Sequence, residues 1–299
     1  MTGTPEPPGC TVCGGTVAPD GHCWDCGEPQ PAYRAHIETT LAAGAAGAAG
    51  VSDRGKRRGV NADAMTLTEA GAWTIGVVCD GVSMSPRADR AARVAADVGA
   101  ARLRAGLREG ALPETVLVEA AARAGRAVGA LAASVDQAPA CTYVAGIAGP
   151  EGIWCAWIGD SRAYWLPDDG TCMALTEDDS GRHDALTAWL GADADEPVAS
   201  VRGYRPPGPG RLLLCTDGLT RHLPEAEGLR AVLARRGRAT PVGHGLLEDA
   251  RMLVGYAMDA GGQDNITALL IRVGDTDHRE LPASAPYRDS CHHGKRRFF

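Results

Sequence analysis

Aspartates stand at the ends of several apolar segments of this sequence, where a carboxylate must either do chemistry or find a partner. Three such segments are TIGVVCDGVS (residues 74–83), IWCAWIGDSR (153–162) and RLLLCTDGLT (211–220), which run to Asp80, Asp160 and Asp217. A single Asp-Gly pair indicates only a turn, and Asp80 could also cap a following helix. A carboxylate at the end of a buried strand, however, costs free energy unless something pairs with it. The repetition therefore indicates a shared ligand.

Two further aspartates stand just before strand-like segments: Asp63 in VNADAM and Asp264 in GGQDNIT. If these strand ends converge, several carboxylates crowd one spot, and their repulsion raises their pKa values and destabilises the fold. Hard divalent cations with oxygen ligands and retained waters remove that conflict. Because no set of Cys and His residues lies nearby, the sequence favours Mg²⁺ or Mn²⁺ over Zn²⁺ at this place.

A different metal chemistry is indicated near the N-terminus by two matched CxxC pairs, each followed by glycine. The pairs are Cys10 with Cys13 and Cys23 with Cys26. Four thiolates at about 2.3 Å in a closed tetrahedron are what structural Zn²⁺ takes. A redox dithiol and two unrelated disulfides are the alternatives. His22 could replace a cysteine, but with four thiolates available we expect it to be a bystander. Residues 1–33 are thus predicted to be a zinc ribbon with its linker.

Four pieces of the remaining chain follow one another in a recognisable order. They are SDRGKRRGVNADA (52–64), VVCDGVS (77–83), WIGDSRAY (157–164) with LLLCTDGL (212–219), and GGQDNIT (261–267). In this order they resemble the metal-dependent protein serine/threonine phosphatases of type 2C, over roughly residues 34–275. One piece alone would be weak evidence, but all of them together make the resemblance specific. An N-terminal ribbon fused to such a domain is similar to an actinobacterial subgroup of that family.

The resemblance implies a fold and a metal centre. The fold is of class α+β, a four-layer αββα sandwich of two antiparallel sheets flanked by helices, with the metal centre at one end. By motif position, Asp80 would bridge two Mn²⁺ or Mg²⁺ ions, and Gly81 would contribute its backbone carbonyl. Asp217 and Asp264 would complete the shell of the first ion.

The other motif positions imply supporting roles. Asp63 would ligate the second ion or orient water on it, and Asp160 would help to hold a weaker third ion. Arg58, five residues before Asp63, would clamp the phosphoryl oxygens. Asn265 would either hydrogen-bond a metal ligand without touching the metal, or simply form the turn that starts the following strand.

The implied reaction is hydrolysis of phosphoserine and phosphothreonine on proteins, opposing serine/threonine kinases. Two metals about 4 Å apart lower the pKa of a shared water, and the hydroxide attacks phosphorus in line with the leaving oxygen. Arg58 and the metals absorb charge on the phosphoryl oxygens. No phosphoenzyme is required, so the ten cysteines need no nucleophilic role. The expected catalytic residues are Arg58, Asp80 and Asp217.

Departures from the family pattern leave a second function open. Ala62 replaces a polar side chain, and Arg221 stands four residues after Asp217, where the family often has another acid. An arginine there could occupy the space of a third cation or repel it. The alternative is a catalytically weak or inactive module that uses the same fold to bind phosphoproteins. Manganese-dependent hydrolysis of a phosphothreonine peptide discriminates between the two.

The acidic stretch LTEDDSGRHDALTAWLGADADEP (175–197) falls where the family has a variable flap beside the site. Its charges would attract basic substrates and disfavour acidic ones. The alternative is a solvated run of surface charge with no part in recognition.

The residues between the motifs must position them. Strand-like segments lie at 34–41, 46–52, 64–69, 73–79, 140–148, 152–158, 161–166, 211–215 and 265–273. Apolar residues at helical spacing predict helices at 86–107, at 113–135, near 224–236 and near 243–260. The order of elements is a group of strands, two helices, a second group of strands and two more helices. This order predicts a core of two sheets with helices on the outside. Residues 34–275 are the predicted phosphatase domain, and 276–299 a flexible tail.

Composition excludes some classes of function. The chain has 299 residues, 44% of them apolar, and a net charge of −7, so a general nucleic-acid-binding surface is not favoured. A nucleic-acid adaptor is further opposed by residues 9–28, which hold no Lys or Arg. No 18-residue apolar run predicts a membrane span, and the first residues lack a signal pattern, so we expect a cytoplasmic protein. The expected partners are phosphorylated proteins, namely a serine/threonine kinase or its targets.

Overall fold

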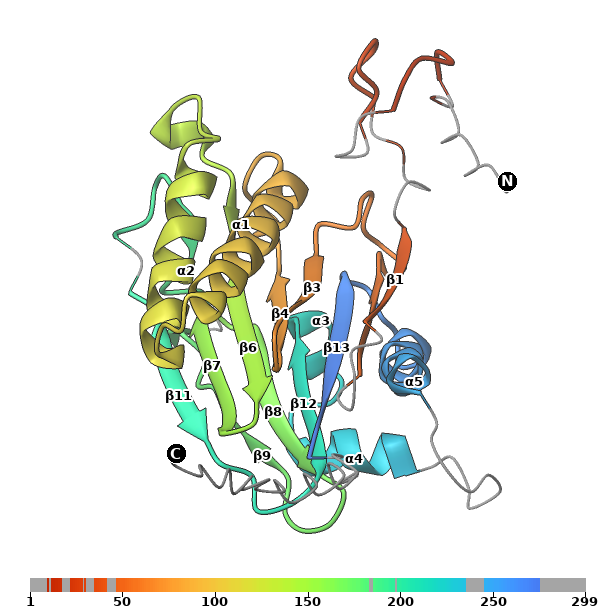
Figure 1. The fold of residues 1–299 in the computed structure, drawn as a ribbon. Coiled ribbons are helices and arrows are strands. Elements are labelled where there is room, and N and C mark those ends of the chain that lie inside the picture. Colours follow the sequence, from red (N-terminus) through yellow and green to blue (C-terminus); the bar gives the residue numbers. More distant parts are fainter. Residues whose placement is uncertain are drawn as a thin grey trace, which may run out of the picture.

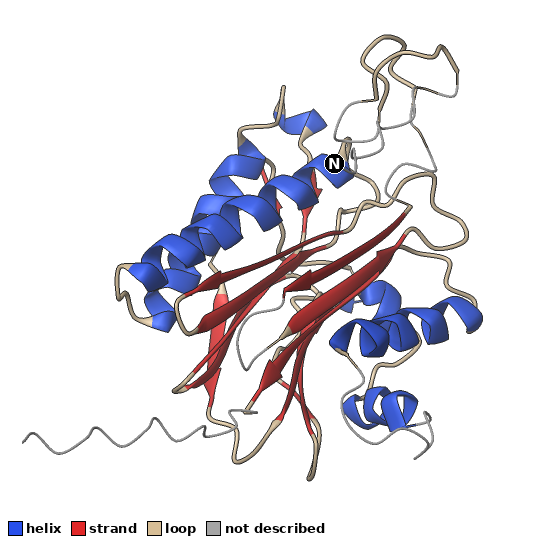
Figure 2. Cartoon of the chain, turned by 45° about the vertical axis from the view of Figure 1, so that its right-hand side comes forward, coloured by secondary structure: helices blue, strands red, loops and turns tan. Residues whose placement is uncertain are grey.

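Two antiparallel β-sheets pack face to face at the centre of the protein, and helices cover both outer faces (Figures 1 and 2). The structure is a computed structural model, and it describes residues 10, 12–17, 22–28, 30, 35–41, 47–182, 185–196, 198–234 and 245–274. The four layers confirm the αββα sandwich of class α+β. The tail predicted at 276–299 lies outside the described residues, and the division at residues 33 and 34 stays a prediction.

The six-stranded sheet has the order β1-β2-β13-β12-β8-β9. Its strands are β1 (His36–Leu41), β2 (Ala48–Asp53), β8 (Arg162–Pro167), β9 (Met173–Ala174), β12 (Gly210–Cys215) and β13 (Ile266–Val273). The five-stranded sheet has the order β11-β7-β6-β4-β3. Its strands are β3 (Ala64–Ala70), β4 (Trp73–Cys79), β6 (Tyr143–Gly149), β7 (Gly152–Ile158) and β11 (Ser200–Tyr204). A separate short pair joins β5 (Ala140–Cys141) and β10 (Leu190–Gly191).

The central strands are apolar throughout because both of their faces are buried. Between the two sheets, Val78, Val144, Leu214 and Leu269 belong to one buried cluster. Strand β13 is the last strand of the described chain, yet it lies inside its sheet, between β2 and β12. The middle of the sandwich therefore depends on residues from both ends of the domain.

Two pairs of helices close the sandwich. The helices are α1 (Ala88–Arg108), α2 (Pro113–Gly129), α4 (Ala226–Ala234) and α5 (Leu246–Asp259). The first pair covers the five-stranded sheet, and the second pair covers the six-stranded sheet (Figure 2). Within the described part of the chain, no helix has the length and apolar character that crossing a membrane requires.

The structure differs from the sequence prediction at several elements, including the short strands β9 and β10, which were not predicted. The helix predicted at 113–135 ends at Gly129, and Val135, the last residue of the predicted range, is 66% exposed. Strand β11 was missed because it is a half-exposed edge strand with one partner, β7, and carries no apolar run. The single turn α3 (Asp217–Thr220) was also missed, because it follows β12 without a break in the apolar pattern.

Strand pairing brings the aspartate-bearing ends of the strands to one end of the sandwich. In the five-stranded sheet, Ala64 pairs with Cys79, so the residues before β3 and after β4 are neighbours. In the six-stranded sheet, Cys215 pairs with Ala268 on one side and with Arg162 on the other. The start of β13, the end of β12 and the start of β8 thus meet at the same edge. The register gathers the candidate aspartates of each sheet at one edge, and the hydrogen bonds from Thr216 and Thr267 to Asp63 join the two edges.

Candidate active site

Five aspartates gather at this end of the sandwich and form an anionic cup, which we define as Asp63, Asp80, Asp160, Asp217 and Asp264. Burial raises the pKa of Asp80 well above its usual value, and the negative charges of the four other members raise it further. Such a shift requires that the carboxylates lie close to one another. The structure therefore brings together all five acids that the sequence singled out.

Asp63 is held by hydroxyl groups from the opposite sheet. The residue is 4% exposed, and its Oδ2 accepts hydrogen bonds from Thr216 Oγ1 over 2.9 Å and Thr267 Oγ1 over 2.7 Å. Burial raises the pKa of Asp63 to about 7, against the lowering effect of these two bonds. Its second oxygen, Oδ1, is buried and has no hydrogen-bond partner among the described residues.

The two threonines belong to a buried hydroxyl network that sequence reasoning missed. Ser52 Oγ lies 2.8 Å from Thr267 Oγ1 and accepts from Asn61 Nδ2 over 2.9 Å. A second pair of hydroxyls supports Asp80: its backbone N–H donates to Thr142 Oγ1 over 3.0 Å, and that oxygen lies 2.7 Å from Ser161 Oγ. The sequence feature that could have indicated this network is a serine or threonine inside or beside an otherwise apolar strand.

Two arginines face the cup. Arg58 donates from Nε and Nη2 to the two oxygens of Asp264, over 2.5 and 2.7 Å. Arg221 donates from Nη2 to Asp217 Oδ2 and from Nη1 to Asp264 Oδ2, the latter over 3.2 Å. Burial alone would raise the pKa of Asp264, but the hydrogen bond from Arg58 brings it below its usual value. Asp217 keeps one buried oxygen, Oδ1, without a hydrogen-bond partner in the described chain.

Glycines let the backbone segments around the cup approach closely. A Cβ at Gly81 would lie 2.7 Å from Ala88 O and 2.9 Å from Ala62 O. At Gly218 a Cβ would lie 1.9 Å from Asn265 O, so the turn that carries Asp217 can touch the backbone after Asp264 only if this residue is glycine.

Asn265 orders the loop that carries Arg58. Its Nδ2 donates to Arg54 O over 2.8 Å and to Val60 O over 3.0 Å, and its Oδ1 accepts from Ala62 N over 2.9 Å. The side chain therefore bonds the backbone of the Arg58 loop at three points.

Asp160 lies at the edge of the cup. It follows Gly159, which has a φ of 103° that only glycine adopts readily. Burial raises the pKa of Asp160 to about 6, and the charges of Asp217 and Asp178 act in the same direction. The Gly159 N–H donates to Asp179 Oδ2 over 2.9 Å, which ties the acidic stretch to this turn.

The acidic stretch at 175–197 is partly neutralised by the protein itself. Asp178 accepts two hydrogen bonds from Arg162, over 2.7 and 2.8 Å, and Glu177 accepts one from Arg202 over 3.0 Å. Asp184, which we also counted as attracting basic substrates, lies outside the described residues. At least two of the acids thus bind arginines of the same chain.

The composition of the cup fits divalent cations. All of its donors are oxygens, which suits Mg²⁺ and Mn²⁺. The buried oxygens Asp63 Oδ1 and Asp217 Oδ1, which have no hydrogen-bond partner in the described chain, would each gain a partner from a cation. Burial and then the neighbouring carboxylates raise the pKa of Asp80, and a cation would offset both effects.

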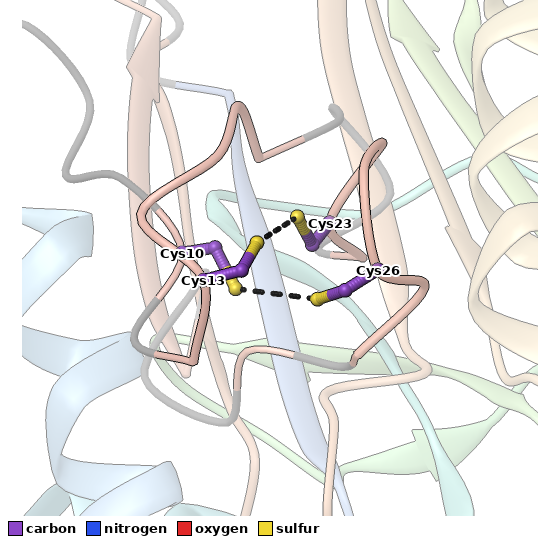
Figure 3. A group of neighbouring side chains, drawn as sticks. All are labelled: Cys10, Cys13, Cys23 and Cys26. Carbon is purple, nitrogen blue, oxygen red and sulfur yellow. Dashed lines mark hydrogen bonds between the residues drawn. The ribbon is translucent and has the colours of Figure 1, made fainter.

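The cysteine module also brings its four thiols together. Figure 3 shows the four side chains pointing towards one another, and all four Sγ atoms lie within 4.8 Å of each other. The two CxxC turns repeat one geometry: the Cys10 N–H donates to Gly15 O over 2.8 Å, and the Cys23 N–H donates to Glu28 O over 3.0 Å. Sulfurs at this spacing are compatible with one tetrahedral Zn²⁺.

A cavity of about 390 Å³ lies beside Arg58. Its walls come from the Arg58 loop, from the segment between β4 and α1, which includes Ser83 and Arg87, and from His22 of the cysteine module. From the sequence, His22 was expected to be a bystander to the zinc site. In the structure it stands close to the predicted phosphoryl clamp.

The comparisons with known proteins agree with this fold. The family model described as "Protein phosphatase 2C" matches residues 53–242, which is more than half of the chain. The chain therefore belongs to the protein phosphatase 2C family.

Named relatives fall in the same class. The chain is similar to the "Serine/threonine phosphatase stp" of Listeria innocua, with 33% identity over 148 residues, 44% of this chain and 55% of that protein. The chain thus spans about half the length of the curated relatives it matches.

Among solved structures the chain is similar to the PPM Ser-Thr phosphatase MsPP from Mycobacterium smegmatis, solved in complex with cacodylate. That comparison gives 26% identity, coverage of 79% of this chain and 100% of that chain, and a TM-score of 0.59. The serine/threonine phosphatase Stp1 from Staphylococcus aureus shares the fold, with 19% identity, coverage of 76% and 94%, and a TM-score of 0.63.

Proposed function

We propose that this protein hydrolyses phosphoserine and phosphothreonine on proteins, in opposition to serine/threonine kinases. The observation that carries the proposal is the anionic cup, in which Asp63 and Asp217 each keep a buried oxygen without a partner beside the Arg58 guanidinium. Membership of the phosphatase family supports the same reaction. Free buried thiols in the sandwich, such as Cys79, Cys155 and Cys215, suit a reducing cytoplasm.

Each member of the cup has a place in this proposal. Asp80 and the Gly81 carbonyl would hold two Mn²⁺ or Mg²⁺ ions between them, with Asp217 and Asp264 on the first ion and Asp63 on the second. When bound, these ions would lower the pKa of a water molecule and stabilise charge on the phosphoryl group.

The protein's own residues would position the substrate. Arg58 has a planar fork of donors, and it already binds the two oxygens of one carboxylate in the geometry that suits two phosphoryl oxygens. In the reaction it would exchange Asp264 for the phosphoryl group and absorb the charge that develops there. The bonds from Asn265 to the backbone at Arg54, Val60 and Ala62 would keep the loop in place during this exchange.

The cysteine module would bind one structural Zn²⁺ through Cys10, Cys13, Cys23 and Cys26. The amide groups of Val12 and Asp25 each donate to a cysteine sulfur over 3.4 Å, and Gln30 Nε2 donates to Cys10 Sγ over 3.2 Å. Donors of this kind stabilise thiolates. A closed set of four protein ligands leaves no open position for chemistry.

Hydrolysis of a phosphothreonine peptide by the full chain, with and without Mn²⁺, tests the proposal. We expect Mn²⁺-dependent release of phosphate, lost in Asp217→Asn, which has nearly the same shape but lacks the negative charge. Thermal unfolding of the variant verifies that it is folded. A folded wild-type protein that binds the phosphopeptide but releases no phosphate would contradict the proposal and favour the phosphoprotein-binding module.

A further inference from the structure

Arg221 places a permanent positive charge against the anionic cup. It ends the short turn α3, and its guanidinium contacts Asp217, four residues earlier, and Asp264. The arginine side chain is 61% exposed, whereas the side chains of Asp217 and Asp264 are 16% and 15% exposed. The guanidinium thus covers the two aspartates from the solvent side. Arginine keeps its charge at every working pH, so this cation is always present.

The contact uses a particular oxygen of Asp217. Oδ2 accepts the hydrogen bond from Arg221, while Oδ1 is the buried oxygen without a partner in the described chain. An aspartate that bridges two metal ions through its carboxylate offers one oxygen to each. With Oδ2 held by the guanidinium, Asp217 can ligate one ion through Oδ1 and has no oxygen left to share with another.

In this arrangement Asp160 has no free oxygen of Asp217 with which to share a third ion. Cys215 pairs with Arg162, so Asp217, two residues later, and Asp160, two residues earlier, lie at the same edge of the sheet. Among the cup members, Asp217 has the strongest electrostatic effect on Asp160. A third ion held by Asp160 would need the Asp217 oxygen that Arg221 occupies. It would also face the Arg221 charge, which reaches Asp160 and Asp80 as well.

We propose that Arg221 is a tethered cation that limits the cup to two divalent ions, by holding Asp217 Oδ2 and by repelling a third ion from Asp160. Arg221 is a positioning residue in this view, because it contacts metal ligands and not the substrate. The inference rests on the proposed metal-dependent function, but it concerns how many ions bind and can be tested without any turnover.

The number of Mn²⁺ ions bound per chain tests the inference on the full-length protein. Wild type and Arg221→Ala, each loaded with Zn²⁺ to fill the cysteine module, are titrated with Mn²⁺ by calorimetry, and free Mn²⁺ is followed by electron paramagnetic resonance. We expect two sites in the wild type. In Arg221→Ala we expect an additional, weaker site, and roughly tenfold tighter binding at the original two, because a nearby positive charge is gone.

Two further variants make the result specific. Adding Asp160→Asn to Arg221→Ala is expected to remove the additional site and leave the other two. Arg251→Ala is the matched control, because Arg251 also contacts two carboxylates, those of Glu38 and Glu248, but lies outside the cup. It is expected to bind two Mn²⁺ ions with wild-type affinity.

Equal stoichiometry and affinity in wild type and Arg221→Ala would overturn the inference, as would three sites in the wild type. A third site that survives Asp160→Asn would also overturn it. If the wild type binds two ions and gains a third on loss of Arg221, yet never hydrolyses a phosphopeptide, the inference stands and the proposed function fails.

Discussion

Arg58 and Asp264 are 206 residues apart in the sequence, yet they form a two-atom ion pair, with Nε 2.5 Å from Oδ1 and Nη2 2.7 Å from Oδ2. The pair joins the loop before β3 to the segment just before β13. It also keeps the proposed phosphoryl clamp, Arg58, next to a proposed metal ligand, Asp264. The guanidinium can therefore bind a substrate phosphoryl group by giving up its hydrogen bonds to Asp264, without a larger movement.

The first prediction concerns the geometry of this clamp. Arg58→Lys keeps the positive charge but loses the planar fork, so we expect kcat/KM for a phosphothreonine peptide to fall by about 10²-fold. Mn²⁺ affinity, measured by calorimetry, should change little. Arg57→Lys is the control, because the neighbouring Arg57 side chain is exposed. Wild-type activity in Arg58→Lys would show that Arg58 only pairs with Asp264.

The second prediction concerns the hydroxyl network under Asp63. Thr267→Val keeps the shape of the side chain but removes the hydroxyl that lies 2.7 Å from Asp63 Oδ2. Because a buried carboxylate then loses a donor, we expect the free energy of unfolding to fall by about 1–3 kcal/mol. Urea unfolding measures the change. Thr267→Ser keeps the hydroxyl and should lose less; equal losses in both variants would assign the effect to packing instead.

The third prediction concerns the close backbone contact at Gly218. In Gly218→Ala the new Cβ would overlap Asn265 O, a backbone atom that cannot rotate away. We expect a loss of roughly 1–3 kcal/mol in the free energy of unfolding, together with weaker Mn²⁺ binding, because Asp217 and Asp264 move apart. Gly228→Ala, in α4, is the control, since its Cβ would meet only Leu223 Cδ2 at 3.5 Å. It should be neutral or stabilising by helix propensity. A Gly218→Ala protein as stable as the wild type would contradict the assigned contact.

The fourth prediction concerns the cysteine module. Deleting residues 1–30 should leave the hydrolysis of para-nitrophenyl phosphate largely intact, because all the proposed ligands and Arg58 belong to the sandwich. Hydrolysis of phosphoproteins is compared on the same preparation, and His22→Ala in the full chain tests the contribution of His22 to the cavity. Loss of small-ester hydrolysis by a folded deletion variant would show that the module contributes to the active site.

The fifth prediction concerns stability at acid pH. Hydrogen bonds from Arg251, and then from His36, lower the pKa of Glu38 to about 2, whereas an unfolded glutamate titrates near 4.3. A lowered folded-state pKa contributes stability that is present above the unfolded value and lost as the pH falls towards about 2. We therefore expect wild type to melt at a higher temperature than Glu38→Gln at pH 6, with the gap closing at lower pH. A gap that is unchanged at acid pH would disprove the assignment.

The positions of the five aspartates could be predicted because each sits at a strand end that the apolar pattern reveals. Asp80 and Asp217 close apolar runs, and Asp63 and Asp264 precede them. Antiparallel pairing then has few ways to arrange such ends, and the register observed at Ala64–Cys79 and Cys215–Ala268 brings them together.

The pairing of individual side chains could not be predicted in the same way. Nothing in the sequence shows that Arg221 bonds Oδ2 of Asp217 and leaves Oδ1 free, because that choice depends on rotamers and on the backbone contact at Gly218. The ion pair of Asp178 with Arg162 joins residues from two different segments, so the acidic stretch looked more strongly charged in the sequence than it is in the fold. Edge strand β11 was not predicted, because it pairs with one strand only and is partly exposed, so its residues show no clear alternation of apolar and polar side chains.

The position of β13 inside its sheet has a consequence for biosynthesis. A nascent chain carries Asp63 and Asp80 long before the ribosome has made Asp264 and the strand that fits between β2 and β12. Until that strand arrives, β2 and β12 have no shared partner and the cup lacks one wall. A polypeptide released early would therefore lack both a closed core and the Asp264 side of the cup.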